Sequence, residues 1–329
     1  QLLTTLTKED EEFLYSQARE VKKEVYGDEV YIRGLIEFTN YCKKDCVYCG
    51  IRAGNRNADR YRLSFDEIME CTDLGYGLGF RTFVLQGGED PFFTDDYMCE
   101  IIRAIKQRHA DCAITLSIGE KSHEAYVKLY EAGADRYLLR HETINPEHYS
   151  KIHSPSQSIA TRVECLKDLK SIGYQVGCGI MIGSPYQTVD NIVEDLLFMK
   201  SFQPHMIGMG PFIANHDDMP NGKLEDTLHV LAITRLMQPN ALLPATTALG
   251  SINKTGREQG ILAGGNVVMP NLSPTSVRAK YALYDGKICT GDEAAECIMC
   301  LTRRVETTGN HIANVRGDSK VEFKDKSTL

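Results

Sequence analysis

Short apolar runs alternate with longer amphipathic segments along most of this chain. The short runs are rich in β-branched and aromatic residues, which favour strands. The longer segments repeat apolar residues at the three- and four-residue spacing of a helix with one buried face. Strands alternating with helices are typical of an α/β fold with a parallel sheet. Eight strands are predicted, at residues 30–38, 81–86, 113–118, 136–140, 175–182, 205–209, 242–246 and 266–269.

Two helical segments give the clearest signals. Residues 7–25 form a predicted helix that Thr7 can cap, with Asp10 three residues further on. Residues 188–201 form a second one, whose apolar positions should lie against the sheet. That expected buried stripe consists of Val189, Ile192, Val193, Leu196 and Leu197.

Eight strand-helix units fit a complete (β/α)8 TIM barrel. No low-complexity tract or linker interrupts the series, so the pattern predicts one domain over residues 1–329. Within it we expect an N-terminal helical extension (1–29), the barrel core (30–273) and a cysteine-containing C-terminal extension (274–329).

Polar clusters follow the predicted strands at the end where barrels collect their reactive groups. Because parallel strands end on the same side of the sheet, these clusters should meet at one mouth. They lie at residues 86–91, 117–120, 140–143, 183–185, 244–248 and 269–271.

Composition narrows the class of protein. The chain is 42% hydrophobic and 25% charged, which is typical of a globular protein. A net charge of −8 argues against nucleic acid as a partner. No run of about 18 apolar residues and no basic-then-apolar start is present, so we expect a cytoplasmic protein without a membrane partner. Eleven cysteines suit a reducing compartment and metal binding better than disulfides.

Three cysteines lie within eight residues directly after the first predicted strand. Cys42, Cys46 and Cys49 have the spacing Cys-x3-Cys-x2-Cys. Three thiolates can hold an iron-sulfur cube and leave one iron open to a small molecule. A structural zinc site or three unconnected thiols are the alternatives, although no His stands in the loop as a fourth zinc ligand.

With its flanking residues, this loop resembles that of the radical S-adenosylmethionine (SAM) superfamily. More narrowly, the chain resembles the HydE-type maturases of the iron-iron hydrogenases, within the biotin synthase-like group of barrels. The likeness covers nearly the whole chain. It is carried by Ile36-Glu37-Phe38, the loop 41–50, Arg60-Tyr61-Arg62 and residues 85–91, 134–143, 244–248 and 266–271.

The resemblance implies a 4Fe-4S cluster held by Cys42, Cys46 and Cys49, with SAM on the open iron. Reductive cleavage of SAM would give methionine and a 5′-deoxyadenosyl radical, with no catalytic residue beyond the cluster and SAM. The resemblance places Tyr48 near the adenine of SAM and Glu142 near the ribose. Gly87 and Gly88, together with Glu89, are expected near the methionine amino group. Arg162 is expected near the SAM carboxylate.

The same resemblance implies a small organometallic substrate, an iron centre carrying carbon monoxide, cyanide and cysteine. A reductant such as ferredoxin or flavodoxin and the other hydrogenase maturases would be its protein partners. A pocket for an anionic complex should offer hydroxyl and amide donors and positive charge. The expected pocket residues are Arg140, Thr246, Thr247, Met269 and Asn271.

A second cysteine group lies near the C-terminus. Cys289, Cys297 and Cys300 have the spacing Cys-x7-Cys-x2-Cys, which matches the optional second cluster site of HydE-type proteins. Three thiolates there can hold a 2Fe-2S or a 4Fe-4S cluster. Zinc or idle reduced thiols are the alternatives.

A basic group flanks the first cysteine loop. Arg52, Arg56, Arg60 and Arg62 can steer an electron donor or an anion, or simply form a solvated loop.

Two further functions compete with the maturase. One is a radical SAM amino-acid mutase of the same barrel group, such as a methylornithine synthase. The other is not an enzyme but an iron-sulfur electron carrier or a zinc-organised interaction domain. The second cysteine group and Thr246-Thr247 favour the maturase.

Overall fold

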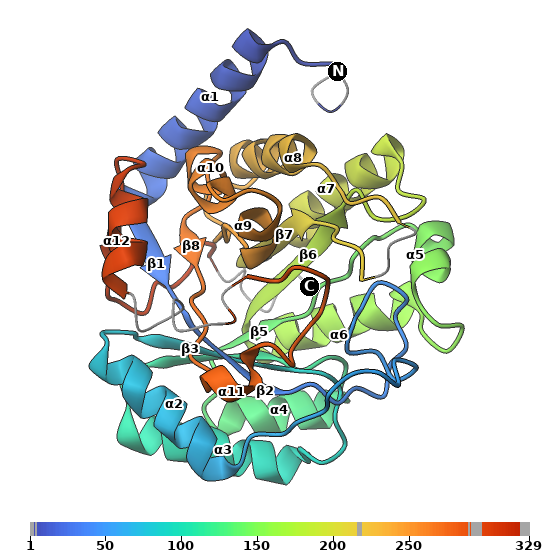
Figure 1. Ribbon diagram of the computed structural model, residues 1–329, viewed down its shortest axis with the longest axis vertical. Helices are drawn as coiled ribbons and strands as arrows, with labels where there is room; N and C mark the ends of the chain where they lie inside the picture. Colours follow the sequence, from blue (N-terminus) through green and yellow to red (C-terminus); the bar gives the residue numbers. More distant parts are fainter. Residues whose placement is uncertain (1–2, 4, 216–218, 289, 291–297, 323–329) are drawn as a thin grey trace.

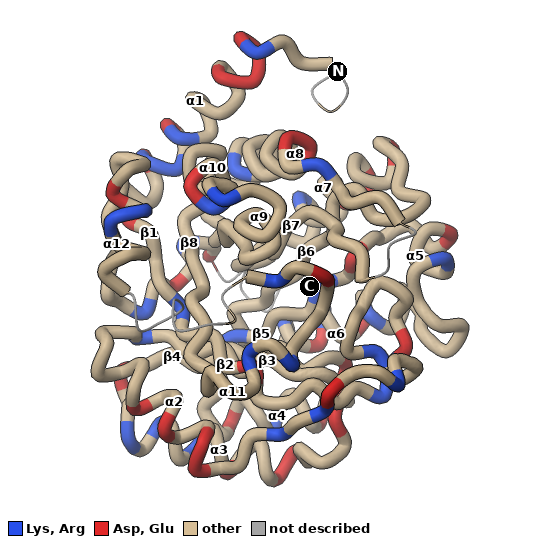
Figure 2. Tube along the Cα trace, in the orientation of Figure 1, with Lys and Arg blue, Asp and Glu red and all other residues tan. Residues whose placement is uncertain are grey.

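Parallel strands surrounded by helices form the body of the protein (Figure 1). The computed structural model describes residues 3, 5–215, 219–288, 290 and 298–322. No helix in these ranges is long and apolar enough to cross a membrane. Basic and acidic positions are spread over the whole trace (Figure 2).

The described strands are β1 (Glu29–Ile32), β2 (Gly34–Thr39), β3 (Thr82–Gly87), β4 (Ala113–Ser117), β5 (Arg136–Leu138), β6 (Gln175–Ile182), β7 (Met206–Pro211), β8 (Val267–Val268) and β9 (His311–Ala313). The described helices are α1 (Lys8–Tyr26), α2 (Phe65–Gly77), α3 (Asp95–Arg108), α4 (His123–Glu131), α5 (Pro146–Ile152), α6 (Ile159–Ile172), α7 (Val189–Phe202), α8 (Leu224–Met237), α9 (Thr247–Ile252), α10 (Gly256–Leu262), α11 (Thr275–Arg278) and α12 (Ile298–Glu306).

The predicted α/β fold with a parallel sheet is confirmed. Strands β2 to β7 form one parallel sheet in sequence order, and β8, β1 and β9 form a second. Isolated parallel bridges connect the two sheets: Met206 with Leu242, Pro244 with Val267, and Asn271 with Leu35. These bridges continue the strand order from β7 back to β2, which is the course of a (β/α)8 barrel. The predicted strand at 242–246 is present only as such bridges.

The first predicted strand divides at Arg33 because its two halves have different neighbours. Residues of β1 pair with β8 and β9, whereas β2 pairs with β3. The sequence did not predict β9, a three-residue strand that adds to the free edge of β1.

The helix boundaries follow the predictions, but one buried face does not. Thr7 caps α1 and Thr188 caps α7, each with a reciprocal capping box. The predicted stripe on α7 is wrong for Val189, Val193 and Leu197, which are 39%, 40% and 57% exposed. The helix buries Asn191, Asp195 and Met199 together with the predicted Leu196, and Asp195 Oδ1 accepts a hydrogen bond from the Ile144 N–H on that side. Asn191 Oδ1 accepts from the Thr188 N–H in the capping box.

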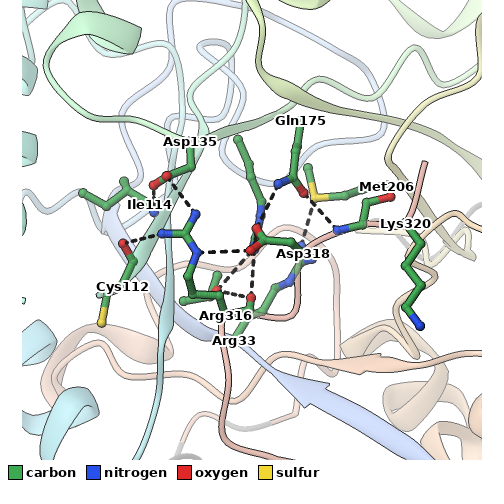
Figure 3. A network of polar contacts seen from close by, with 12 residues as sticks. Arg33, Cys112, Ile114, Asp135, Gln175, Met206, Arg316, Asp318 and Lys320 are labelled. Atoms are coloured by element: carbon green, nitrogen blue, oxygen red, sulfur yellow. Dashed lines mark hydrogen bonds and ion pairs between the residues drawn. The ribbon is translucent and has the colours of Figure 1, made fainter. Parts of the chain in front are cut away.

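A C-terminal segment, residues 311–321, contacts the barrel where the strands begin. Figure 3 shows Arg316 and Asp318 of this segment among Asp135 and Gln175. Fully buried Arg136 contacts Asp318 Oδ1 at 2.6 Å and the carbonyl of Arg316 at 2.8 Å. Gln175 Nε2 donates to the same Asp318 oxygen at 2.8 Å. These contacts support the expectation that residues 274–329 belong to the same domain as the barrel, which stays a prediction.

The charge of Arg136 decides the ionisation of Asp318. Burial alone would raise the pKa of Asp318, but the Arg136 guanidinium holds that pKa well below its usual range. Asp318 is therefore ionised in the folded protein at neutral pH.

We predict that Asp318→Ala lowers the free energy of unfolding by about 1–3 kcal/mol, because buried Arg136 loses its carboxylate. The stabilisation is present above the unfolded carboxyl pKa of about 3.9 and is lost as pH falls below it, so the two proteins should converge in acid. Urea unfolding at several pH values measures this. Asp96→Ala, which breaks an exposed pair with Lys128, should leave the free energy of unfolding nearly unchanged. Equal effects of the two substitutions would contradict the prediction.

Candidate active site

The cysteine loop follows β2 at the mouth of the barrel. Cys42, Cys46 and Cys49 are free and partly buried thiols. Burial, together with the neighbouring thiols of Cys46 and Cys42, raises the pKa of Cys49 to about 12. Iron binding at this loop would therefore release protons. No three His, Cys, Asp or Glu side chains in the described ranges are grouped to hold a single metal ion.

Hydrogen-bond donors point at two of the three sulfurs. The backbone N–H groups of Lys44 and Glu89 donate to Cys42 Sγ, each at 3.4 Å. Gln157 Nε2 donates to Cys46 Sγ at 3.4 Å. Such donors favour the thiolate form, and hydrogen bonds to sulfur are typical of protein-bound iron-sulfur clusters. These residues therefore fit a cluster. Sequence reasoning missed Gln157, because a loop glutamine more than 100 residues away carries no spacing signal.

The glycine pair after β3 lies against the cysteine loop. A Cβ on Gly88 would lie 2.2 Å from the Tyr41 carbonyl oxygen and 2.7 Å from Cys42 Cβ. A Cβ on Gly87 would lie 2.8 Å from the Thr39 side chain. The backbone can approach the loop this closely only without side chains. The expected approach of the pair to SAM stays a prediction.

Two carboxylates beside this turn are tied to the loop by lysines. Glu89, 8% exposed, lies 3.6 Å from Lys43 Nζ and 3.9 Å from Lys44 Nζ. Its Oε1 accepts a hydrogen bond from the Glu120 backbone at 3.0 Å. Glu120 in turn contacts Lys44 Nζ and Arg162 Nε, both at 2.8 Å.

The predicted carboxylate-binding arginine, Arg162, thus already faces a carboxylate of the chain. Burial would raise the pKa of Glu120, but the charges of Arg162 and Lys44 lower it overall. Glu120 is a site residue that the sequence analysis did not single out, although its place after β4 was visible.

Tyr48 is held by a histidine. Its hydroxyl lies 3.2 Å from His153 Nε2, and the His153 ring stacks on Tyr149 at 3.7 Å. Burial lowers the pKa of His153 to about 4, so the ring is neutral. Since Nδ1 lies 3.1 Å from the Tyr149 carbonyl, Nδ1 carries the proton and Nε2 accepts from Tyr48. The sequence offered no partner for His153.

Glu142 faces the cysteine loop from the end of β5. It is buried, and Oε2 lies 3.0 Å from Arg140 Nη2. Burial raises the pKa of Glu142. Burial is the main cause of the raised pKa values of Tyr48 and Cys49, and the negative charge of Glu142 raises both pKa values further. The structure thus brings the predicted ribose ligand close to the loop.

The expected pocket residues differ in their free hydrogen-bonding capacity. Thr246 Oγ1 is buried without a hydrogen-bond partner, and Thr247 begins α9 beside it. Met269 is partly buried and packs against a core cluster that includes Met206, Leu242 and Val267. Asn271 donates to Glu37 Oε2 and accepts from the Ser273 backbone, both at 2.8 Å, so both ends of its amide are occupied.

The basic group beside the loop is largely used within the protein. Arg60 donates to the carbonyls of Asn40, Ile51, Arg52 and Asn55. Arg62 pairs with Asp90 at 2.7 Å and lies over the Tyr41 ring at 3.9 Å. These two arginines brace the loop.

Of the second cysteine group, Cys289 and Cys297 lie outside the described residues, and Cys300 lies in α12. The segment before it is anchored to the barrel by Lys287, whose Nζ lies 2.6 Å from Glu37 Oε1.

We predict that Gly88→Ala reduces the iron bound after anaerobic reconstitution, because the new Cβ would displace the cysteine loop. Overpacking of this kind costs about 1–3 kcal/mol. Iron per chain and thermal unfolding measure both effects. Gly77→Ala is the matched control, since a Cβ there meets nothing within 4 Å. Equal iron content in the two variants would refute the steric argument.

Comparison with known proteins agrees with this site. Residues 36–199 match the sequence model of the Radical SAM superfamily. The chain is 45% identical over 318 residues to the FeFe hydrogenase maturase subunit HydE of Thermotoga maritima, covering 95% of this chain and 90% of that protein. It is 31% identical to 3-methylornithine synthase of Methanosarcina barkeri, covering 94% and 87%.

Solved structures show the same barrel fold. A crystal structure of methylornithine synthase superposes with a TM-score of 0.81 at 29% identity, covering 95% of this chain and 92% of that one. A crystal structure of HydG, a maturase of the FeFe hydrogenase, gives a TM-score of 0.79 at 20% identity, covering 95% and 71%, which speaks for the fold alone. With its cysteine loop at the mouth of such a barrel, the chain belongs to the radical SAM enzymes and, among them, to the family of the HydE-type hydrogenase maturases.

Proposed function

We propose that this enzyme reductively cleaves SAM to a 5′-deoxyadenosyl radical and acts in assembly of the iron-iron hydrogenase active-site cluster. The observation that carries the proposal is the 45% identity to HydE over 95% of the chain. The free thiols of the cysteine loop and the N–H donors aimed at two of them support it.

Cys42, Cys46 and Cys49 would hold a 4Fe-4S cluster, which together with SAM supplies the electron and the radical. Around it the chain provides binding groups. Glu89 would accept the methionine ammonium, with Gly87 and Gly88 leaving room for it.

Three further residues would orient SAM from the other side of the loop. Glu142 would accept hydrogen bonds from ribose hydroxyls, and Tyr48, fixed by His153, would lie beside the adenine. Arg162 would share its fork between Glu120 and the SAM carboxylate. The burial of these groups excludes water from the reacting atoms.

The substrate we infer is a small organometallic iron complex carrying carbon monoxide and cyanide. The unpartnered hydroxyl of Thr246 and the guanidinium of Arg140 provide donors for such an anion, and Thr247 and Met269 complete its pocket. Asn271 would shape this pocket through Glu37. A ferredoxin or flavodoxin as reductant and the other hydrogenase maturases are the partners we expect, in the cytoplasm.

A methylornithine synthase is the second candidate. The TM-score of 0.81 to one methylornithine synthase and the 31% identity to another over 94% of this chain support this candidate. Such an enzyme rearranges the carbon skeleton of lysine, so its product distinguishes it from the maturase.

We predict that the reduced, reconstituted protein forms 5′-deoxyadenosine from SAM, and that Cys46→Ser reduces this to background because a cluster ligand is lost. Chromatographic quantification of 5′-deoxyadenosine measures both. The wild-type protein should also restore hydrogenase activity in a maturation system that lacks its HydE component. If it cleaves SAM but fails there, and instead converts lysine to methylornithine, the second candidate replaces the first.

We further propose that Cys289, Cys297 and Cys300 hold a second 2Fe-2S or 4Fe-4S cluster once the disulfide at Cys300 is reduced. The reconstituted wild-type chain should then bind more iron than one 4Fe-4S cluster contains, and Cys300→Ser should lose the excess. Cys165→Ala, which removes a buried thiol on α6, is the control and should keep it. An unchanged iron count in Cys300→Ser would eliminate the second cluster.

A further inference from the structure

A buried histidine-carboxylate pair, formed by His141 and Asp195, lies next to Glu142. We propose that Asp195, acting with His141, is a positioning residue that holds Glu142 in the conformation that presents its carboxylate to SAM. The proposal rests on the proposed function, since it takes Glu142 as a SAM ligand.

The backbone of Glu142 adopts a conformation that must be held by its surroundings. Its φ is 63°, and among the described residues other than glycine only Tyr186 and Gln203 share a positive φ. A left-handed backbone is unfavourable for a residue with a side chain. The Glu142 carboxylate lies 3.0 Å from Arg140 Nη2, and its charge acts on Tyr48 and Cys49 of the cysteine loop.

Strand β6 supplies the first restraint on this turn. The backbone N–H groups of His141 and Glu142 both donate to the Gly179 carbonyl, at 3.1 and 3.0 Å. The Gly179 N–H donates back to His141 Nδ1 at 3.3 Å. The His141 side chain therefore closes a reciprocal link between the end of β5 and β6.

Asp195 of α7 supplies the second restraint from the other side. Its Oδ1 accepts a hydrogen bond from the Ile144 N–H at 2.5 Å and lies 3.3 Å from His141 Nε2. Because His141 Nδ1 accepts from Gly179, the ring proton is on Nε2 and faces the carboxylate. Asp195 thus contacts the chain on both sides of Glu142, at residues 141 and 144.

The cost of this arrangement indicates that position is its purpose. Asp195 and His141 are both 0% exposed, and Asp195 forms no ion pair with Lys or Arg in the described part of the chain. Its second oxygen, Oδ2, is buried without a hydrogen-bond partner. Burying a carboxylate in this way destabilises the folded protein, so its contacts must serve another purpose. An apolar residue on the inner face of α7 would stabilise the fold better.

The neighbouring residue provides a matched control. Glu194, also on α7, accepts a hydrogen bond from Asn145 Nδ2 at 2.9 Å, on the exposed side of the same turn. Among the hydrogen bonds of the described residues, Glu194 forms none with residues 141 to 144.

The test measures the dissociation constant of SAM, by titrating SAM into the reduced, cluster-loaded protein and following the EPR spectrum of the cluster. Asp195→Ala should weaken SAM binding about tenfold or more, as expected for loss of a charge-assisted hydrogen bond. Asp195→Asn should rescue part of it, since the amide oxygen can still accept from Ile144. Glu194→Ala should bind SAM as the wild type does. The rate of 5′-deoxyadenosine formation at saturating SAM should change less than the dissociation constant.

A double-variant cycle separates positioning from general destabilisation. If Asp195 acts through Glu142, then Asp195→Ala or Asp195→Asn should add little in a Glu142→Gln background. Should the effects add in full, or should SAM affinity survive Asp195→Ala while Glu142→Gln weakens it, the positioning role is refuted and the proposed SAM site stands. If Glu142→Gln itself leaves SAM affinity unchanged, the assignment of Glu142 fails and the positioning role fails with it. If Asp195→Ala does not fold, Asp195→Asn carries the cycle.

Discussion

The close approach of backbone to the cysteine loop is the constraint on which the site depends. The loop has no regular secondary structure, so its geometry comes from the chain segments packed against it. On one side, Gly88 lies against Tyr41 and Cys42. On the other, Gly50 donates to the Leu283 carbonyl at 2.8 Å, and a Cβ on Gly50 would lie 2.0 Å from the Ala282 oxygen. The loop is therefore shaped by the barrel and by the C-terminal extension together.

Several charged side chains near the loop form ion pairs with one another. Glu120 stands between Lys44, which belongs to the loop, and Arg162, which belongs to α6. Arg62 neutralises Asp90 behind the glycine turn. Because pairing offsets the cost of removing a charge from water, these contacts hold side chains from four separate segments together. A low-dielectric pocket with fixed dipoles is what binding of a charged cofactor requires.

Features with a local signal were predictable from sequence, and features made by distant contacts were not. The strand-helix alternation, the Thr7 cap and the cysteine spacing are local, and each led to a correct fold element or family. The face of α7 was mispredicted because Asp195 is buried, where it contacts residues 141 and 144. A hydropathy pattern does not predict a buried carboxylate. Gln157 was missed, and His153 had no partner visible in sequence, because their partners Cys46 and Tyr48 are distant along the chain.

The position of β1 between β8 and β9 has a consequence for how the chain folds. Both of its partners come from the far end of the sequence, at residues 267–268 and 311–313. During synthesis both edges of the first strand therefore stay unpaired until residues 267–268 and 311–313 have left the ribosome. Long-range pairing of this kind slows folding and exposes strand edges to aggregation. The cysteine loop, only a few residues downstream, is thus translated long before the barrel that shapes it is complete.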